Sequence, residues 1–212
     1  MGKNLFISCY LLLGTSCIHS DFQGNIAVNQ PVVERISPIK KEEPKQPVIE
    51  PYEKIVPIAK SFVGITEVGG NNQGFSDKSY QRRLEKLGWK KGQSWCGYAV
   101  MAVLDSAGIK HKITAWSPTS FNKSNVIYTD GEFRKPMREG DVMSLTYQKF
   151  INDKSRYKGI GHTGIVEKTV DNGRNVVTYE GNAQETGGGN DGGGFHKKIR
   201  PINKSLHITR WE

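Results

Sequence analysis

The pattern of hydrophobic and polar positions predicts a folded region over 52–212 whose first half is helical. Apolar residues recur at helical spacing over 52–66, where Pro57 favours a helix start. The same spacing returns over 78–88, and Gly88 is a typical helix end. The stretch between these helices is rich in Gly and Asn, which predicts a loop.

A third helix is predicted from Cys96 onward. In the segment "CGYAVMAVLDSAGI", Val100, Val103 and Leu104 lie on one helical face, and Gly108 marks the end. The sequence therefore predicts a buried helix of about three turns that begins at a cysteine.

In the second half of this region, the spacing of apolar residues changes from helical to the alternation typical of strands. A short helix is predicted over 117–126, with Ser117 or Thr119 as its cap. The turn Asp171-Asn172-Gly173 is typical of a hairpin. Four segments read as strands: 140–147, 161–170, 175–181 and 194–202. Helices followed by antiparallel strands indicate an α+β domain, with the helices packed on one face of a curled antiparallel sheet.

The N-terminus has the pattern of an export signal. Lys3 precedes a run of about nine apolar residues, which is too short for a membrane span of roughly twenty. Small residues before Cys17 resemble a bacterial lipobox, although Gly14 stands where leucine is usual. We expect residues 1–17 to be a signal peptide of lipoprotein type, with lipid on Cys17. An ordinary signal peptide is the alternative.

Residues 18–51 are expected to be a disordered linker, because Pro, Lys and Glu dominate and apolar surface is scarce. The remaining residues, 52–212, suffice for one domain. The net charge of +9 favours anionic polymers of a cell envelope or simply solubility. No basic motif typical of nucleic-acid binding is present, so nucleic acid is not an expected partner. We expect a monomer.

Cys96 carries the clearest chemical signal. The chain has three cysteines. If Cys9 leaves with the signal peptide and Cys17 carries lipid, the mature chain has one thiol and no internal disulfide. Without a CxxC motif, a redox function is disfavoured. A helix N-terminus stabilises a thiolate and offers N–H groups to an oxyanion, which favours a nucleophile over a structural cysteine.

The partners of Cys96 are predicted in the strand half. With the hairpin turn centred near residue 172, positions equidistant from it pair, which places His162 opposite the segment of Glu180 and Asn182. A histidine can take a thiol proton, and a carboxylate or amide can orient its ring. The pattern therefore predicts a cysteine–histidine site oriented by Glu180 or Asn182.

Several segments resemble, in order, the CHAP-domain cysteine amidohydrolases and peptidases, relatives of the NlpC/P60 peptidoglycan hydrolases. They are "SWCGYAVMAVLDSAGI", "GDVMSL", "GHTGIVEK", "VVTYEGN" and "GGGFHKKIRPI", and "VGITEVGGNNQG" is similar to the leader of one subgroup. The resemblance covers about 60–205 and implies a papain-like fold. It also implies that Cys96 is the nucleophile and His162 the base, with Glu180 and Asn182 orienting the imidazole.

Further residues are expected at a substrate cleft. For three of them an alternative is open: Tyr98 narrows the cleft or fills the core, and Glu67 and Asn72 each line the cleft or cap a loop. The expected set is Trp95, Gly97, Tyr98, Glu67, Asn72 and Gly161.

Two loops and the scattered histidines need interpretation. The basic segment 146–159 either overhangs the cleft or is a solvated loop. The glycine-rich 187–194 lacks the Lys-Ser/Thr ending of a phosphate loop and reads as a flap. His111, His196 and His207 lack ligand spacing, so we expect no metal and no cofactor.

Taken together, these features predict a cell-envelope cysteine hydrolase that cleaves a peptidoglycan amide through an acyl-enzyme. An N-acetylmuramoyl-L-alanine amidase and a stem-peptide or cross-bridge endopeptidase are both compatible with the site. We expect a lipoprotein of the bacterial periplasm or outer surface, or otherwise a secreted protein. The alternative is a non-catalytic envelope-binding lipoprotein that retains the fold.

Overall fold

The computed structural model describes residues 50–186 and 193–212. The predictions for the signal peptide, for lipid on Cys17 and for nearly all of the linker lie outside these residues. So does most of the predicted glycine flap. Among the described residues, no helix has both the length and the apolar character needed to cross a membrane.

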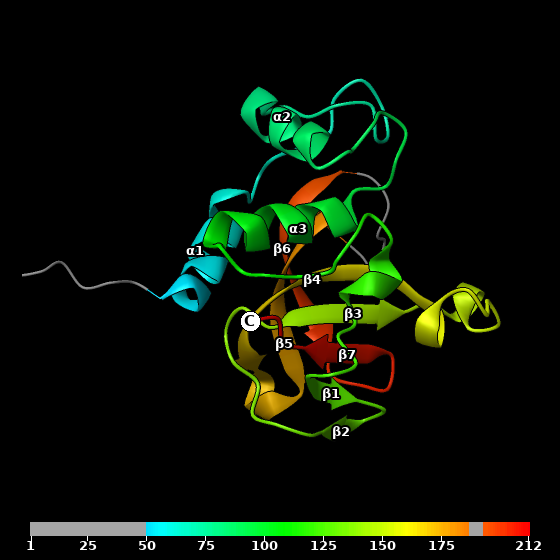
Figure 1. Ribbon diagram of the computed structural model, residues 1–212. Coiled ribbons are helices and arrows are strands. Elements are labelled where there is room, and N and C mark those ends of the chain that lie inside the picture. The colour runs from blue at the N-terminus through cyan, green and yellow to red at the C-terminus, as the bar shows by residue number, and fades with distance from the viewer. Residues whose placement is uncertain (1–49, 187–192) are drawn as a thin grey trace, which may run out of the picture. The chain divides into compact units, whose positions relative to one another are not determined.

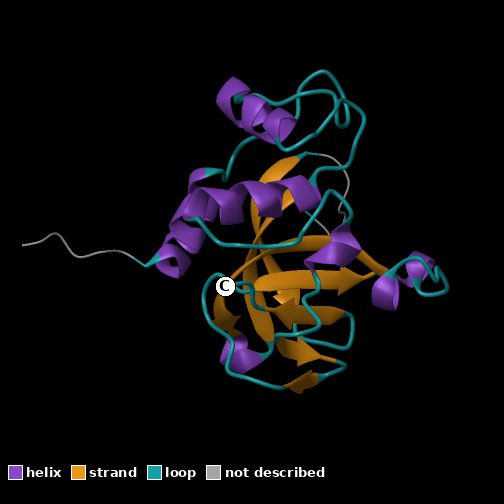
Figure 2. Cartoon of the chain, viewed as in Figure 1, coloured by secondary structure: helices purple, strands orange, loops and turns teal. Residues whose placement is uncertain are grey.

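Within the described residues, three α-helices precede a seven-stranded antiparallel sheet (Figures 1 and 2). This confirms the α+β class and the order of helices before strands. The helices are α1 (Ile55–Ser61), α2 (Lys78–Lys86) and α3 (Cys96–Ala107). In the sheet order β2-β1-β7-β3-β4-β5-β6, the bounds are β2 (Glu132–Phe133), β1 (Val126–Thr129), β7 (Leu206–Thr209), β3 (Val142–Thr146), β4 (Ile160–Val170), β5 (Asn175–Ala183) and β6 (Gly194–Pro201).

The first two helices form where the sequence predicts them, although α1 is shorter than the 52–66 segment and α2 ends at Lys86, before Gly88. A 3₁₀ turn, η1 (Pro51–Lys54), leads into α1, so Pro57 lies within the first turn rather than at the helix start. Proline is tolerated there because first-turn N–H groups have no intrahelical partner. Asp77 caps α2 by accepting hydrogen bonds from the next turn's N–H groups.

The helix predicted over 117–126 is wrong. Only the 3₁₀ helix η2 (Ser117–Ser120) forms, and Phe121 is already extended. The Asn122 side chain accepts the backbone N–H of Ser124, a local turn that competes with helical hydrogen bonding. The chain therefore leaves the helical conformation before β1 begins at Val126.

The four predicted strands are confirmed as β3, β4, β5 and β6, and three others were missed. The missed strands β1, β2 and β7 have 4, 2 and 4 residues. All four residues of β7 are buried, and its Leu-His-Ile-Thr alternation spans only four positions. Such short segments carry too little pattern to be recognised from sequence.

The predicted hairpin register is confirmed near the site. Ile165 pairs with Tyr179, and Val166 with Thr178, each pair equidistant from residue 172. A bulge shifts the register by one residue before Lys168. The turn residues Asp171, Asn172 and Gly173 all have positive φ, which these residue types tolerate.

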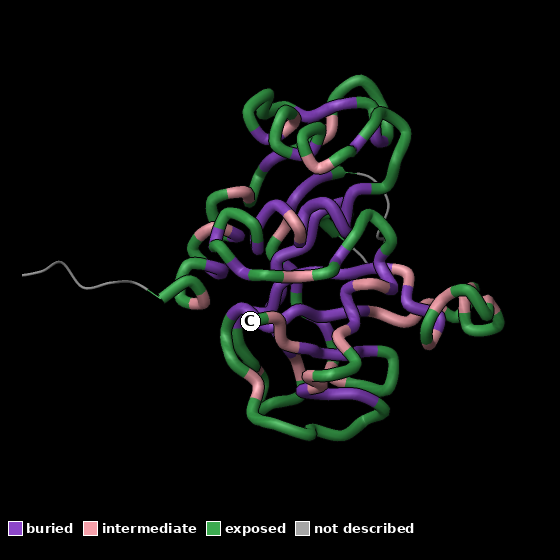
Figure 3. The backbone as a smooth tube through the Cα atoms, viewed as in Figure 1, coloured by how far each residue is buried: buried purple, intermediate pink, exposed green. Residues whose placement is uncertain are grey.

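The main hydrophobic core lies between α3 and the sheet. Buried side chains of α3 share this core with Ile165 of β4 and Tyr179 of β5, and α1 and α2 also contribute side chains. Val166, the neighbour of Ile165, belongs to a second cluster formed mainly by strand residues. Because successive strand residues point to opposite faces, both faces of β4 are buried. Figure 3 shows α3 and the central strands as the most buried parts of the chain.

Two glycines allow α3 to approach its neighbours closely. A Cβ on Gly97 would lie 2.6 Å from the carbonyl oxygen of Thr114 and 2.7 Å from that of Ala115. A Cβ on Gly181 of β5 would lie 2.5 Å from the ring of Trp95. These distances leave no room for a side chain, so both positions require glycine for space rather than for backbone conformation.

We expect Gly97→Ala to lower the free energy of unfolding by about 1–3 kcal/mol, because backbone atoms cannot move aside as a side chain can. This loss should appear although alanine favours a helix more than glycine does. Urea denaturation followed by circular dichroism measures it.

Gly74→Ala is the matched control. A Cβ on Gly74 would lie 3.3 Å from its nearest neighbour, Oε1 at the end of the flexible Gln81 side chain. The change should therefore stay within about 0.5 kcal/mol. Equal losses in the two variants would contradict the steric account of Gly97.

Candidate active site

Trp95 fixes the start of α3 and therefore the position of Cys96. Its indole Nε1–H donates to Glu67 Oε1 at 2.7 Å, and its ring packs edge-on against Phe75. The ring also lies against Gly181 of β5, where a larger residue would not fit. Trp95 is fully buried and is not among the residues lining the pocket beside Cys96, so it anchors the start of α3 from within the core.

Glu67 also holds the loop that precedes α2. Its second oxygen, Oε2, accepts the backbone N–H of Asn72 at 2.9 Å. Asn72 is buried and has a positive φ, a conformation that asparagine tolerates. Glu67 therefore caps the loop at Asn72 and links it to Trp95, and neither residue is among those lining the pocket beside Cys96.

His162 and Glu180 form a fully buried hydrogen-bonded pair. The Nε2 atom of His162 lies 2.9 Å from Oε2 of Glu180, and both side chains are 0% exposed. Gly164 permits this approach, because a Cβ there would lie 2.7 Å from Cγ of Glu180. Between the two predicted orienting residues, Glu180 is the one that hydrogen-bonds the imidazole.

Arg200 is the principal partner of Glu180. Its guanidinium donates from Nε to Oε1 at 2.8 Å and from a terminal nitrogen to Oε2 at 2.5 Å. Thr178 donates to Oε1 as well. The carboxylate therefore accepts hydrogen bonds from two neighbouring strands, which makes it a rigid support for His162.

Sequence reasoning missed Arg200 for a physical reason. The alternation in β6 would place the apolar Ile199 inside and Arg200 outside. In the structure Ile199 is 62% exposed and Arg200 is buried. The buried carboxylate of Glu180 accounts for the burial of Arg200, and no pattern within the strand encodes it.

Glu180 and His162 each stabilise the charged form of the other. Burial alone would raise the pKa of Glu180, but hydrogen bonds from Arg200 and His162 outweigh it and lower the pKa to about 2. Burial alone would lower the pKa of His162, but Cys96 and Glu180 outweigh it and raise the pKa to about 9. The arrangement therefore favours a carboxylate and an imidazolium at neutral pH.

Cys96 interacts with the His162 ring. The Nδ1 atom of His162 is buried and makes no geometric hydrogen bond among the described residues, while side-chain hydrogen bonding with Cys96 acts to raise the pKa of the ring. Cys96 is a free cysteine, 5% exposed, at the first position of α3. No side chain caps this helix, so its first-turn N–H groups are available to a negative charge.

A bulge in β5 separates Asn182 from Glu180. Simple alternation would keep the two on one face, but the register shifts between Glu180 and Ala183. Asn182 has a φ of 56° within this bulge and is buried beside the Cys96 pocket. Bulges commonly redirect a side chain in this way. Asn182 is therefore a pocket residue, while Glu180 supports His162.

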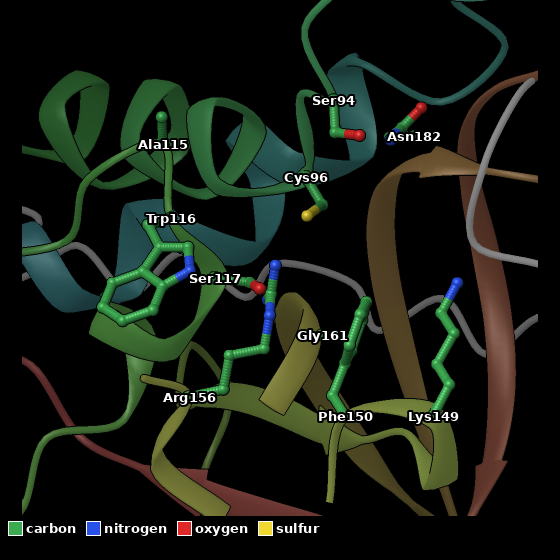
Figure 4. Close-up of a pocket in the computed structure, with 10 residues that line it drawn as sticks. All are labelled: Ser94, Cys96, Ala115, Trp116, Ser117, Lys149, Phe150, Arg156, Gly161 and Asn182. Atoms are coloured by element: carbon green, nitrogen blue, oxygen red, sulfur yellow. The ribbon is translucent and has the colours of Figure 1, made fainter. Parts of the chain in front are cut away.

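A pocket of about 250 Å³ opens beside Cys96 (Figure 4). Residues from the start of α3, from the segment before η2 and from the basic segment 146–159, here called the basic loop, form its walls. They are Ser94, Cys96, Ala115, Trp116, Ser117, Lys149, Phe150, Arg156, Gly161 and Asn182. Of the six expected cleft residues, the structure places Gly161 at this pocket.

Gly97 and Tyr98 belong to the packing of α3 rather than to the pocket. Gly97 contacts the backbone of the 114–115 segment, as described above. Tyr98 is buried in the main core, and its hydroxyl bonds Gly88 O and Gln93 Oε1. Of the two interpretations of Tyr98, filling the core is the one the structure supports.

The basic loop contributes two aromatic contacts that the sequence did not identify. Tyr147 stacks on the imidazole of His162, with ring centroids 6.5 Å apart and planes 30° apart. A Cβ on Gly161 would lie 2.2 Å from the Tyr147 ring and 2.8 Å from Phe150. Gly161 therefore allows both rings to close over the start of β4, which shields His162 from solvent.

Among the described residues, no three His, Cys, Asp or Glu side chains gather closely enough to hold a metal ion. Comparison of the chain with protein-family models, with curated proteins and with solved structures gives no match.

We expect Glu180→Gln to lower the unfolding free energy at pH 7 by about 3 kcal/mol, since it leaves Arg200 buried without its anion. A carboxyl with a lowered folded pKa stabilises the fold above its unfolded pKa and loses this contribution as pH falls. The difference in unfolding free energy between wild type and variant should therefore shrink as the pH falls from about 4.5 to about 2. Urea denaturation across this range measures it.

Glu167→Gln is the matched control. The pKa of Glu167 is also lowered to about 2, because hydrogen bonds from Lys60 and Lys197 outweigh its burial. It lies outside the pocket, so this variant should change acid stability but not the reactivity of Cys96. If the difference in unfolding free energy between wild type and Glu180→Gln stayed constant down to about pH 2, the lowered pKa of Glu180 would be contradicted.

Arg200→Met should narrow the pH range in which Cys96 is reactive. Without the guanidinium, burial raises the pKa of Glu180, and His162 loses the anion that keeps it protonated. Alkylation of Cys96 at pH 6 should slow about 10-fold, roughly the effect of one pKa unit. Mass spectrometry of the Cys96 peptide measures the rate from pH 5 to 9.

Arg200→Lys keeps the charge and should retain most of the rate. A merely structural role would lower stability without moving the pH profile. If the profile of Arg200→Met matched that of the wild type, Arg200 would not be a positioning residue for this pair.

Proposed function

We propose that the protein is a cysteine hydrolase that cleaves an amide bond in peptidoglycan. The observation that carries this proposal is the buried chain of contacts from Arg200 through Glu180 to His162, with Cys96 at the start of α3 beside a pocket. Such an arrangement is typical of an activated thiol nucleophile. A structural cysteine would need no ionised histidine beside it.

The proposed acylation step uses the charges of the resting pair. The Cys96 thiolate attacks the amide carbonyl carbon, and the resulting oxyanion is stabilised by N–H groups at the start of α3. The imidazolium of His162 then gives its proton to the amide nitrogen. The C–N bond breaks, the amine leaves, and a thioester remains on Cys96.

Deacylation reverses the proton movement. The now neutral imidazole takes a proton from water, whose oxygen attacks the thioester carbon. The C–S bond breaks, the carboxylic acid leaves, and the thiolate and imidazolium are restored. Glu180 keeps the ring oriented and stabilises its positive charge in both steps, and it is not itself protonated.

The choice of peptidoglycan rests on the resemblance to CHAP-domain and NlpC/P60 hydrolases. Helices before an antiparallel sheet, a cysteine at a helix start and a histidine at a strand start agree with the papain-like fold that this resemblance implies. The same site serves an amidase or an endopeptidase, so both remain within the proposal. An N-terminal lipid on Cys17 would hold the hydrolase at the cell envelope.

The test is incubation of the full chain with purified peptidoglycans of several types, followed by mass spectrometry of the released fragments. We expect new amine and carboxylate ends from the wild type, and roughly a 10⁴-fold loss of rate in Cys96→Ala and in His162→Ala. The fragment masses identify the bond. Freed stem peptides indicate an amidase, and cut stems or cross-bridges indicate an endopeptidase.

Cys17→Ala is the matched cysteine control and should keep the wild-type rate in detergent solution. Equal circular dichroism spectra establish that the variants fold. If the wild type released nothing from any peptidoglycan while Cys96 was intact, the proposed function would be wrong, and the non-catalytic envelope-binding role would stand in its place.

A further inference from the structure

The wall of the Cys96 pocket is positively charged. Two of the ten residues that line it, Lys149 and Arg156, carry a positive charge, and none is Asp or Glu. Both come from the basic loop, and their side chains rise from below Cys96 in Figure 4. Apart from Cys96, the other lining residues have side chains that carry no charge.

Arg200 behind the pocket is already paired. Its guanidinium donates to the carboxylate of Glu180, which also hydrogen-bonds His162. Lys149 and Arg156 are therefore the cations that a substrate meets on the lining of the pocket.

The basic loop holds its cations in place. The guanidinium of Arg156 lies 4.1 Å above the Phe150 ring and donates to Ile160 O. Its Nε also lies 3.4 Å from Asp153, whose side chain is 39% exposed, so solvent screens this pair. The ammonium of Lys149 lies 5.0 Å from the same ring, and no ion pair to it occurs among residues 50–186 and 193–212.

The base of the loop is fixed to the sheet. Thr146 donates to Lys158 O at 2.6 Å, and Tyr147 N–H bonds Gly159 O. Lys158 in turn pairs with Asp130 beside β1. Hydrogen bonds therefore close the base of the loop, and the Lys158–Asp130 ion pair links it to the end of β1.

We propose that Lys149 and Arg156 make this pocket select substrates that carry a free carboxylate next to the amide that Cys96 attacks. The proposal deepens the hydrolase function above and rests on it. A carboxylate matches the planar donors of arginine and the point charge of lysine. The Arg156 side chain is 22% exposed, and this partial burial strengthens its attraction relative to bulk water. Substrates with a carboxamide at the same position lack this attraction.

The first experiment measures the charge at the pocket without any substrate. The full chain is alkylated with iodoacetate, an anion, and with neutral iodoacetamide, and the two rates at Cys96 are read by mass spectrometry. We expect the iodoacetate-to-iodoacetamide ratio to fall about 3-fold in Lys149→Met and in Arg156→Gln, and about 10-fold in the double variant. Added salt should reduce the wild-type ratio.

Two further variants control this ratio. Lys154→Met removes an exposed cation from the same loop, outside the pocket lining, and should leave the ratio unchanged. Arg156→Lys keeps the charge and should restore most of the ratio, which separates charge from loop folding. Equal ratios in the wild type, Lys149→Met and Arg156→Gln would overturn the proposal, as would an equal fall in Lys154→Met.

The second experiment uses one peptidoglycan before and after its carboxylates are converted to carboxamides with carbodiimide and ammonia. The wild type should cleave the unmodified material faster, and the double variant should lose this preference. Equal rates on both materials would refute the selectivity while leaving the hydrolase function intact. Cleavage of neither would refute the hydrolase function, and the alkylation ratio alone would then decide whether the pocket attracts anions.

Discussion

The buried ion pair between Glu180 and Arg200 is the interaction on which the site depends. A carboxylate with 0% exposure is costly unless it is paired and hydrogen-bonded, and Arg200 supplies two bonds from the neighbouring strand. Glu180, held by Arg200, orients His162 and raises the pKa of its ring, as does the interaction with Cys96. The contacts therefore run from β6 through β5 and β4 to α3.

Close packing brings these elements together. Gly97 lets the start of α3 rest against the 114–115 backbone, Gly181 admits the Trp95 ring, and Gly164 admits Glu180. At Gly161 the absence of a side chain lets the basic loop close over the start of β4. These four positions share one property: a Cβ would meet another atom at less than 3 Å. Space, more than backbone freedom, explains the glycines around the site.

Much of the site could be predicted because its parts follow local rules. A cysteine at a helix start, a histidine at a strand start and an Asp-Asn-Gly turn at residues 171–173 are each visible in a short window of sequence. The turn fixes the register by counting, which brings Glu180 to His162. Asn182 shows the limit of counting, because the bulge after Glu180 redirects its side chain toward the pocket. The helix predicted over 117–126 failed for a similar reason, since a local Asn122 turn replaced helical bonds.

The sequence alone determined the α+β order, the third helix, the hairpin and the pairing of His162 with Glu180, because periodicity and turn chemistry act between near neighbours in the chain. The tertiary structure decided the exposure of Ile199, the burial of Arg200 and the presence of Lys149 and Arg156 at the pocket. These depend on charges and surfaces brought together from distant segments. A buried carboxylate can hold an arginine inside while an isoleucine one residue away lies in water, and no local pattern records that balance.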